Sequence, residues 1–432
     1  MQIAELYKLY LQFPSIQTDT RKVKQSDLFF ALKGPNFNGN FFAGEALAKG
    51  AAYAIVDEQP AKDDARIIAV PDVLKTLQDL ALYHRRQFIL AAPEKQIPFL
   101  AITGSNGKTT SKELVHAVLS SVFKTYTTEG NLNNHIGIPL TILKVRQDAD
   151  IAIIEMGANH QKEIEAYCTY TLPTHGVITN CGKAHLEGFG GEEGVRKGKG
   201  ELFDYLRLNN GTAFIMQDYD YLLEMSKGMP TIITYGTDKA DFTGTVKSGS
   251  GLLEVSITAG AKIDSIKTNL VGDYNLPNVL LAVAIGKYFQ VPDEKIKGAL
   301  ENYIQSNSRS QLIEKDTNKI ILDAYNANPT SMKAAIENFA KMEGAEKVLI
   351  LGGMMELGSA SIHEHQNLID LINKYKWKAV VLVGGDFNKV NHSFPFFNNS
   401  LQAAAWFKMQ SFGHSHILIK GSRSTAMEKV LE

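Results

Sequence analysis

The chain has 432 residues, 44% of them hydrophobic and 21% charged, so it is long enough for about two to four domains with separate cores. Its 45 basic and 46 acidic side chains leave a net charge of −1, which argues against nucleic-acid or anionic-membrane partners. Two cysteines make no disulfide framework, and no apolar run approaches the roughly 18 residues of a membrane span. We therefore expect a cytoplasmic protein.

Residues 1–95 are predicted to form a small α/β domain. Glu5 and Lys8 interrupt the apolar N-terminus, which therefore matches neither a signal peptide nor a membrane anchor. Strands are expected at 27–32 and 52–56, and helices at 42–49 and 73–86. The polar stretches 18–21 and 34–39 could bind a polar ligand, although composition alone favours ordinary solvated turns.

The second predicted domain, residues 96–306, opens with a phosphate-binding pattern. An apolar run at 97–102 leads into Thr103-Gly104-Ser105-Asn106-Gly107-Lys108-Thr109-Thr110, and an amphipathic segment follows at 111–123. In such a strand–turn–helix unit, backbone N–H groups face the phosphates, Lys108 reaches the terminal phosphates and Thr109 can bind Mg²⁺. The generic P-loop pattern has a further glycine at the position of Ile102, so this is a shortened loop. The alternative is a plain glycine turn with a surface lysine.

The rest of this domain predicts a mainly parallel sheet with polar groups where strands end. Glu155 follows a buried strand at 151–154 and could be a second acid for Mg²⁺. His185 and the basic run 188–200 follow a strand at 176–180. From composition alone they could be a loop histidine with satisfied hydrogen bonds and lysines on a solvated face. A strand-rich insert is expected over 214–258, and Asn275 could cap a helix at 279–289 or contact a base.

Residues 307–432 are predicted to form a Rossmann-like domain. Its strands and helices alternate, with strands at 320–323, 347–353, 379–385 and 416–421 and helices at 331–342, 365–375 and 401–409. No Gly-x-Gly-x-x-Gly follows these strands, which argues against dinucleotide binding. Ligand groups are expected at the strand ends: Asp323, 325–329, Lys420, Ser422 and Arg423.

Several of these motifs occur together and in order in one known family. The phosphate loop is followed by Glu155-Met156-Gly157, the segments 184–190 and 199–203, Asp323-Ala324-Tyr325-Asn326-Ala327-Asn328-Pro329, Glu356-Leu357-Gly358 and Lys420-Gly421-Ser422-Arg423. Over nearly its whole length the chain resembles the Mur ligases, the amino-acid and peptide ligases of peptidoglycan precursor synthesis. The resemblance implies three α/β domains: an N-terminal nucleotide-sugar domain, a central P-loop domain and a C-terminal Rossmann-like domain.

The motifs look most like those of members that add D-alanyl-D-alanine to UDP-MurNAc-tripeptide. The resemblance implies that ATP phosphorylates the tripeptide carboxylate and that the dipeptide amine then attacks the acyl phosphate. Lys108 would stabilise the phosphates, Thr109 and Glu155 would hold one Mg²⁺, and His185 would bind a second. Lys199 would be carbamylated by CO₂, which converts this cation into an anion able to hold Mg²⁺.

The resemblance also implies binding residues in all three domains. Nucleotide contacts are expected from the phosphate loop, Asn275, Arg309 and Asp323, and substrate contacts from Thr20, Arg21, Asn133, Asn134, Asn326, Asn328, Lys420 and Arg423. We expect a monomer. The alternatives are the ligase that adds the third residue, folylpolyglutamate synthase, a regulatory P-loop NTPase and a non-catalytic binding module; the Asp-Asn-Pro-Arg-type motif of the first is absent.

Overall fold

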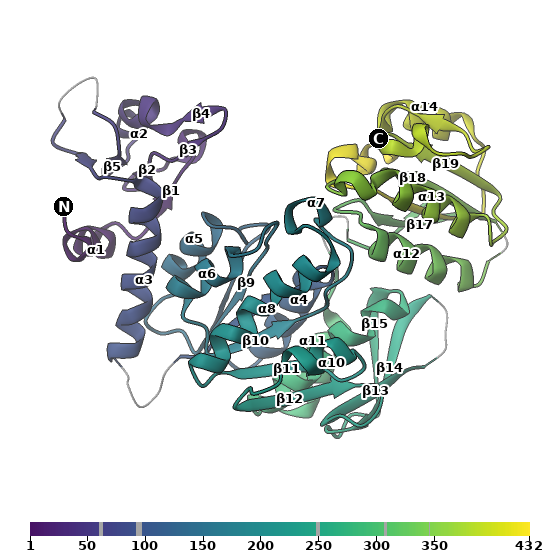
Figure 1. The fold of residues 1–432 in the computed structure, drawn as a ribbon, viewed down its shortest axis with the longest axis horizontal. Helices are drawn as coiled ribbons and strands as arrows, with labels where there is room; N and C mark the ends of the chain where they lie inside the picture. Colours follow the sequence, from purple (N-terminus) through teal and green to yellow (C-terminus); the bar gives the residue numbers. More distant parts are fainter. Residues whose placement is uncertain (60–63, 92–96, 248–250, 306–308, 345) are drawn as a thin grey trace.

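The chain forms three α/β domains, each built around its own sheet (Figure 1). The computed structural model describes residues 1–59, 64–91, 97–247, 251–305, 309–344 and 346–432. The predicted boundaries at 95/96 and 306/307 lie outside the described residues. No helix in the described ranges combines the length and apolar character needed to cross a membrane.

The first domain has a small parallel sheet in the order β1-β2-β5-β6. Its strands are β1 Ile16–Gln17, β2 Leu28–Phe30, β5 Tyr53–Val56 and β6 Ile67–Ala69, and a hairpin joins β3 Lys33–Gly34 to β4 Phe37–Asn38. The helical elements are α1 Ile3–Gln12, η1 Thr20–Lys22, η2 Gly39–Phe42, α2 Ala43–Ala48 and α3 Val73–Ala91. The long helix α3 runs from this domain to the central one (Figure 1).

The central domain is organised by a nine-stranded sheet in the order β15-β14-β13-β12-β11-β10-β7-β9-β8. Its strands are β7 Phe99–Thr103, β8 Thr125–Thr127, β9 Ile151–Glu155, β10 His175–Ile178, β11 Thr212–Met216, β12 Thr231–Gly236, β13 Phe242–Lys247, β14 Leu252–Ala259 and β15 Ser265–Val271. Neighbouring strands are parallel from β8 through β9, β7, β10, β11 and β12 to β13. The last two pairs, β13–β14 and β14–β15, are antiparallel. The strand-rich region is therefore an extension of this sheet, whereas the sequence suggested an insert.

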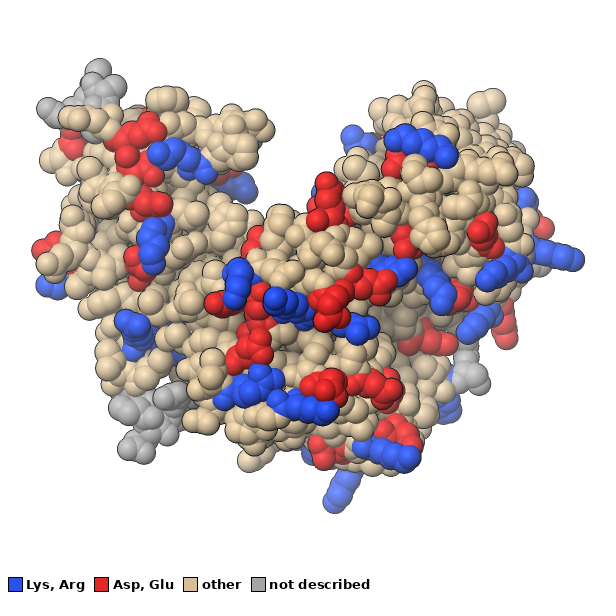
Figure 2. Space-filling model, viewed as in Figure 1, with Lys and Arg blue, Asp and Glu red and all other residues tan. Residues whose placement is uncertain are grey.

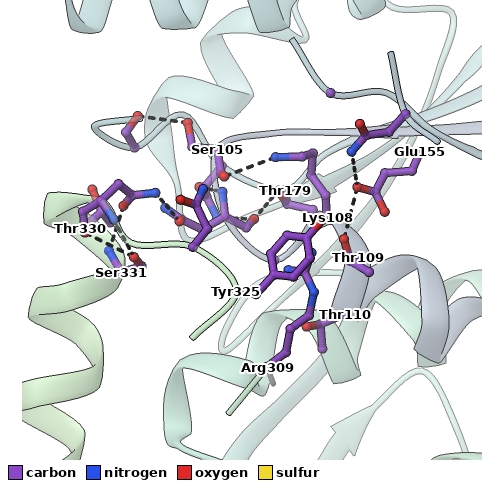
Figure 3. A pocket seen from close by; sticks show the side chains of 18 of the residues that line it. Ser105, Lys108, Thr109, Thr110, Glu155, Thr179, Arg309, Tyr325, Thr330 and Ser331 are labelled. Carbon is purple, nitrogen blue, oxygen red and sulfur yellow. Dashed lines mark hydrogen bonds between the residues drawn. The ribbon is translucent and has the colours of Figure 1, made fainter. Parts of the chain in front are cut away.

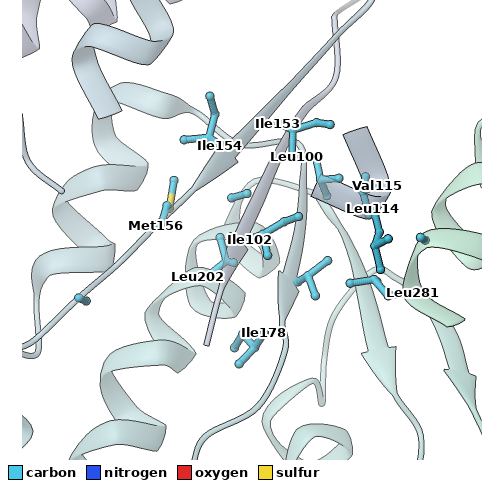
Figure 4. Close-up of a cluster of buried hydrophobic side chains, with 14 of the residues drawn as sticks. Leu100, Ile102, Leu114, Val115, Ile153, Ile154, Met156, Ile178, Leu202 and Leu281 are labelled. Carbon is cyan, nitrogen blue, oxygen red and sulfur yellow. The ribbon is translucent and has the colours of Figure 1, made fainter. Parts of the chain in front are cut away.

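Helices cover both faces of this sheet, as the fully buried strands β7 and β9 require. These helices are α4 Lys108–Ser120, α5 Gly137–Lys144, α6 Glu163–Thr171, α7 Leu186–Phe189, α8 Glu192–Leu208, α9 Asp220–Met225, α10 Leu276–Tyr288 and α11 Asp293–Asn302. Figure 4 shows strand residues such as Leu100 and Ile102 packed with Leu114 of α4, Leu202 of α8 and Leu281 of α10. This packing holds the carboxyl ends of the parallel strands β7, β9 and β10 together at one end of the sheet.

The third domain has the predicted Rossmann-like alternation. Its sheet order is β16-β17-β21-β18-β19-β20, parallel except for β16. The strands are β16 Gln311–Lys315, β17 Asn318–Asp323, β18 Lys347–Gly352, β19 Ala379–Val383, β20 Phe396–Phe397 and β21 His416–Lys420, and the helices are α12 Pro329–Lys341, α13 Ser361–Ile372 and α14 Ser400–Met409. The carboxyl ends of β17 and β21 carry Asp323 and Lys420 toward the central domain.

Candidate active site

The turn between β7 and α4 has the backbone shape of an anion cradle. Gly104 has φ +136° and Gly107 has φ +79°, conformations that L side chains rarely adopt. A Cβ on Gly104 would lie 2.0 Å from Thr179 Oγ1, and one on Gly107 would lie 2.7 Å from Asn278 Oδ1. Gly104, whose added Cβ would also lie 3.0 Å from the backbone nitrogens of Thr179 and Asn180, is therefore required by space as well as by φ, and Gly107 is required by φ. The N-terminus of α4, with its free N–H groups, begins directly after Gly107.

A second loop, which follows β10, braces the phosphate loop. Ser105 N donates to Asn180 O at 2.8 Å, and Asn106 N donates to Asn180 Oδ1 at 3.0 Å. Thr179 Oγ1 donates to Asn106 O at 2.6 Å. The sequence showed a strand that runs into polar residues here but assigned Thr179 and Asn180 no role. Their contacts fix the cradle before any ligand arrives, which lowers the entropic cost of binding.

Lys108, the first residue of α4, lies over this turn (Figure 3). Its Nζ donates to Gly104 O at 2.7 Å and to Ser105 O at 3.2 Å. Burial lowers the pKa of Lys108, while the Glu155 carboxylate opposes that shift and Arg309 adds to it. The cation is thus held at the loop by two carbonyl groups, within the space that bound phosphates would share.

Glu155 ends β9 beside the first turn of α4, as the sequence predicted. Its side chain is buried, and its Oε1 accepts hydrogen bonds from Thr109 Oγ1 at 3.1 Å and from Asn133 Nδ2 at 2.8 Å. Its Oε2 is also buried but has no hydrogen-bond partner among the described residues. An orphaned carboxylate oxygen next to a threonine hydroxyl and a phosphate cradle fits a hard cation such as Mg²⁺, which prefers oxygen ligands and retains water and phosphate oxygens.

Lys199 and His185 flank this region from other elements. Lys199 lies on α8 with its Nζ 3.1 Å from Ala158 O and 4.9 Å from the centre of the Phe189 ring. Burial, with a smaller contribution from Lys108, lowers the pKa of Lys199 to about 7. His185 Nδ1 meets the Glu356 carboxylate of the third domain. Within the described ranges, no three His, Cys, Asp or Glu side chains form a metal-binding cluster.

Apart from Lys199, which is buried behind the wall and is not among the described lining residues, these groups border a cleft of about 1640 Å³ between the central and third domains. Figure 2 shows a deep recess above the central domain, between the first and third domains. The cleft is lined by the phosphate loop, Glu155 and His185 from the central domain and by Asp323, Asn326, Asn328, Lys420 and Arg423 from the third. Asn328 Nδ2 bridges the two domains by donating to Asn106 Oδ1 at 2.7 Å. Sequence-distant motifs therefore share one site.

Some predicted ligand contacts use their polar groups within the protein. Lys420 Nζ donates to Asp323 Oδ2 at 2.6 Å and to Asn326 O at 3.1 Å. Asn275 lines the cleft, but its Nδ2 donates to Val271 O and its Oδ1 accepts from Asn278. Direct contact of Asn275 with a base would thus require these internal bonds to be exchanged.

The remaining predicted residues occupy varied positions. The Arg309 guanidinium lies 3.5 Å above the centre of the Tyr325 ring, at the cleft wall (Figure 3). Asn134 lines the cleft, and its Oδ1 accepts from Ile136 N and Gly137 N at the start of α5. Thr20 and Arg21 lie on η1 in the first domain, and neither is among the described residues that line this cleft.

The wall of the cleft also contains residues that received no role from the sequence. These are Tyr219, Tyr221 and Tyr235 beside the ends of β11 and β12, and Met355 and Glu356 after β18. Polar residues after strands of a parallel sheet could have signalled the tyrosines. No sequence signal brings Glu356 to His185, because that contact depends on how two domains pack.

A phosphate loop with an acid on the neighbouring strand, facing a Rossmann-like domain across one cleft, defines a three-domain P-loop nucleotide-binding protein. Three family models match the chain: "Mur ligase family, catalytic domain" over residues 12–85, "Mur ligase middle domain" over 102–286, and "Mur ligase, glutamate ligase domain" over 308–423. The chain belongs to the Mur ligase family, so the predicted family and three-domain α/β fold are confirmed.

Individual relatives support the same conclusion. UDP-N-acetylmuramoyl-tripeptide--D-alanyl-D-alanine ligase of Escherichia coli (strain K12) is 34% identical over 438 residues, 99% of this chain and 95% of that protein. The enzyme of that name from Bacillus subtilis (strain 168) is 34% identical over 402 residues, 88% of this chain and 84% of that one. A crystal structure of MurF from Acinetobacter baumannii has a TM-score of 0.86 at 31% identity, covering 96% of this chain and 92% of that one.

Proposed function

We propose that this protein is an ATP-dependent amide ligase that joins D-alanyl-D-alanine to UDP-MurNAc-tripeptide, giving the UDP-MurNAc-pentapeptide, ADP and phosphate. The observation that carries the proposal is the phosphate loop beside Glu155, whose Oε2 has no partner among the described residues, in a cleft completed by the third domain. Relatives of that name, 34% identical over most of their length, support the choice of substrates.

The chemistry explains why such a ligase needs this site. A carboxylate does not condense with an amine unaided, so its oxygen attacks the γ-phosphorus of ATP and expels ADP. The dipeptide amine then attacks the acyl carbon, phosphate leaves, and the nitrogen loses a proton. The first step brings two anions together, and their repulsion is offset by Lys108 and by the N–H groups at the start of α4.

The same site accounts for the proposed metal ions. Thr109 and Glu155 would hold one Mg²⁺, and His185 and carbamylated Lys199 would hold a second. Bound Mg²⁺ neutralises phosphate charge and polarises the oxygen that leaves. Two features of Glu155 support the first assignment: its Oε1 accepts from Thr109, and its Oε2 has no partner in the part of the chain that the structure describes.

Carbamylation of Lys199 is supported by its environment. The neutral amine adds to CO₂ with loss of one proton, which leaves an N-carboxylate anion. A pKa of about 7 provides that neutral amine near neutral pH. Since an unmodified, buried cation beside Lys108 would repel Mg²⁺, the modification reconciles Lys199 with a metal site.

The substrate contacts complete the proposal. The tripeptide would extend from Thr20 and Arg21 toward Asn133 and Asn134, and the dipeptide would meet Asn326, Asn328, Lys420 and Arg423. Nucleotide contacts would come from Asn275, Arg309 and Asp323. We propose that the protein acts in the cytoplasm, since its substrates are water-soluble nucleotide sugars and a free dipeptide, and that it acts as a monomer.

Phosphate release tests the function directly. With ATP and Mg²⁺, release should require both UDP-MurNAc-tripeptide and D-alanyl-D-alanine, and omission of either should abolish it. A regulatory NTPase would release phosphate without the peptide substrate. The ligase for the third residue would turn over with UDP-MurNAc-dipeptide and a diamino acid, and that result would replace the proposal.

A further inference from the structure

The loop that carries His185 contacts the third domain at several points. Helix α7, which begins directly after His185, lies beside the third domain (Figure 1). Lys183 N donates to Thr330 Oγ1 at 3.0 Å, and Lys183 Nζ pairs with Glu364 Oε1 at 2.7 Å. The Glu356 carboxylate meets His185 Nδ1 in the same region. A residue of the third domain thus touches a residue that the proposed function places at a metal.

Both members of this contact have unusual backbone conformations. His185 has φ +53° and Glu356 has φ +61°, although neither is glycine. L residues enter this left-handed region at an energetic cost, and such residues concentrate at functional sites. Because these two strained residues meet across a domain interface, we attribute their backbone conformations to the contact between their side chains rather than to local folding.

The segment that presents Glu356 is itself held in place. Met354 N donates to the buried ring of His365 at 3.1 Å through Nε2, and the other ring nitrogen of His365 lies 2.8 Å from Ser361 O. Ser422 Oγ donates to the neighbouring Gly353 O at 2.5 Å. Glu356 therefore approaches His185 from a constrained loop, as a residue that orients another side chain should.

We propose that Glu356 is a positioning residue that selects the His185 tautomer with the proton on Nδ1. Among the described residues the buried Nδ1 has the ion-pair contact with Glu356 but no hydrogen bond, so an N–H placed on Nδ1 would face the carboxylate and leave the lone pair of Nε2 for a ligand in the cleft. Metal-binding histidines commonly donate their second ring nitrogen to a carboxylate in this way. The inference rests on the proposed metal role of His185. It means that the site is complete only when the third domain is docked.

Two substitutions at position 356 separate this role from folding. Glu356→Gly removes the carboxylate but suits φ +61°, so its melting temperature should equal or exceed that of the parent. Glu356→Gln retains an acceptor oxygen of the same reach and should show an intermediate effect. Glu364→Gln is the matched control, because Glu364 pairs with Lys183 on the same loop but does not contact His185.

The first measurement is ¹⁵N NMR of histidine-labelled, metal-free protein, with the His185 signals identified by their loss in His185→Gln. The parent and Glu364→Gln should show the Nδ1–H tautomer, and Glu356→Gly should shift toward Nε2–H. An unchanged tautomer in Glu356→Gly would overturn the proposal. This result is independent of any metal.

The second measurement is Mn²⁺ affinity, by EPR, with a non-hydrolysable ATP analogue present. Glu356→Gly should weaken the second Mn²⁺ about 10- to 100-fold, while Glu364→Gln should stay within about threefold. Affinity within twofold of the parent in Glu356→Gly, together with a loss in His185→Gln, would refute the positioning role alone. If His185→Gln binds Mn²⁺ normally, the proposed metal role of His185 fails, and the NMR result still decides the contact.

Discussion

Gly104→Ala is the sharpest test of the phosphate cradle. At φ +136° a non-glycine residue carries strain of about 1–3 kcal/mol, equivalent to about 5- to 150-fold in rate at about 1.4 kcal/mol per decade. The new Cβ would also lie 2.0 Å from Thr179 Oγ1, where real Cβ contacts do not fall below 3.0 Å. Either Thr179 or the loop that it braces must therefore move by about an ångström, and a displacement of that size can cost about 100-fold in catalysis.

We expect kcat/KM for ATP to fall at least about 100-fold in Gly104→Ala, measured by coupled ADP release with both co-substrates saturating. Adding Thr179→Ala should recover part of the loss, because it removes the overlapping oxygen but not the φ strain; a double-mutant cycle measures that recovery. Gly228→Ala is the control, since Gly228 has φ +77°, only ordinary contacts and no place in the cleft. A kcat/KM within threefold of the parent in Gly104→Ala would refute the reasoning.

Four further predictions concern the cations and the domains. Lys108→Ala should abolish turnover, because the phosphates lose their nearest cation; steady-state activity within tenfold of the parent would refute that role. Lys199→Ala should be nearly inactive and partly rescued by small carboxylic acids, and no rescue would count against a carbamate. In ¹³C NMR at constant dissolved CO₂, the Lys199 carbamate should increase as pH rises through about 7, since deprotonation supplies the reactive amine; a signal that is insensitive to pH, or that persists in Lys199→Ala, would contradict it. Small-angle scattering should show contraction when an ATP analogue and both substrates bind, and identical profiles would argue against domain closure.

The features that sequence predicts well here are local. Strand, glycine turn, Lys108 and helix are contiguous, and Glu155 directly follows an apolar strand, so periodicity and turn chemistry suffice to place them. The Rossmann-like alternation of the third domain was recognisable for the same reason. Helix α1 was missed although its buried residues Leu6, Tyr7 and Tyr10 recur at helical spacing, and β15 was missed although its burial alternates.

The features that sequence could not supply depend on packing between distant segments. Thr179 and Asn180 brace the phosphate loop only because β10 lies beside β7. The Asn328–Asn106 and Glu356–His185 contacts exist only because the third domain docks on the central one. A polar side chain at a strand end signals a site, but its partner is decided by tertiary structure. Asn275 illustrates this, because its amide is occupied by Val271 and Asn278.

The central claim is that the nucleotide held at residues 104–109 transfers its last phosphoryl group to a peptide carboxylate. The most direct measurement uses UDP-MurNAc-tripeptide labelled with ¹⁸O in its terminal carboxylate, with mass spectrometry of the released phosphate. One ¹⁸O atom should pass into each phosphate, because the carboxylate oxygen that attacks phosphorus leaves with it. Phosphate without ¹⁸O, formed while the pentapeptide accumulates, would contradict the account.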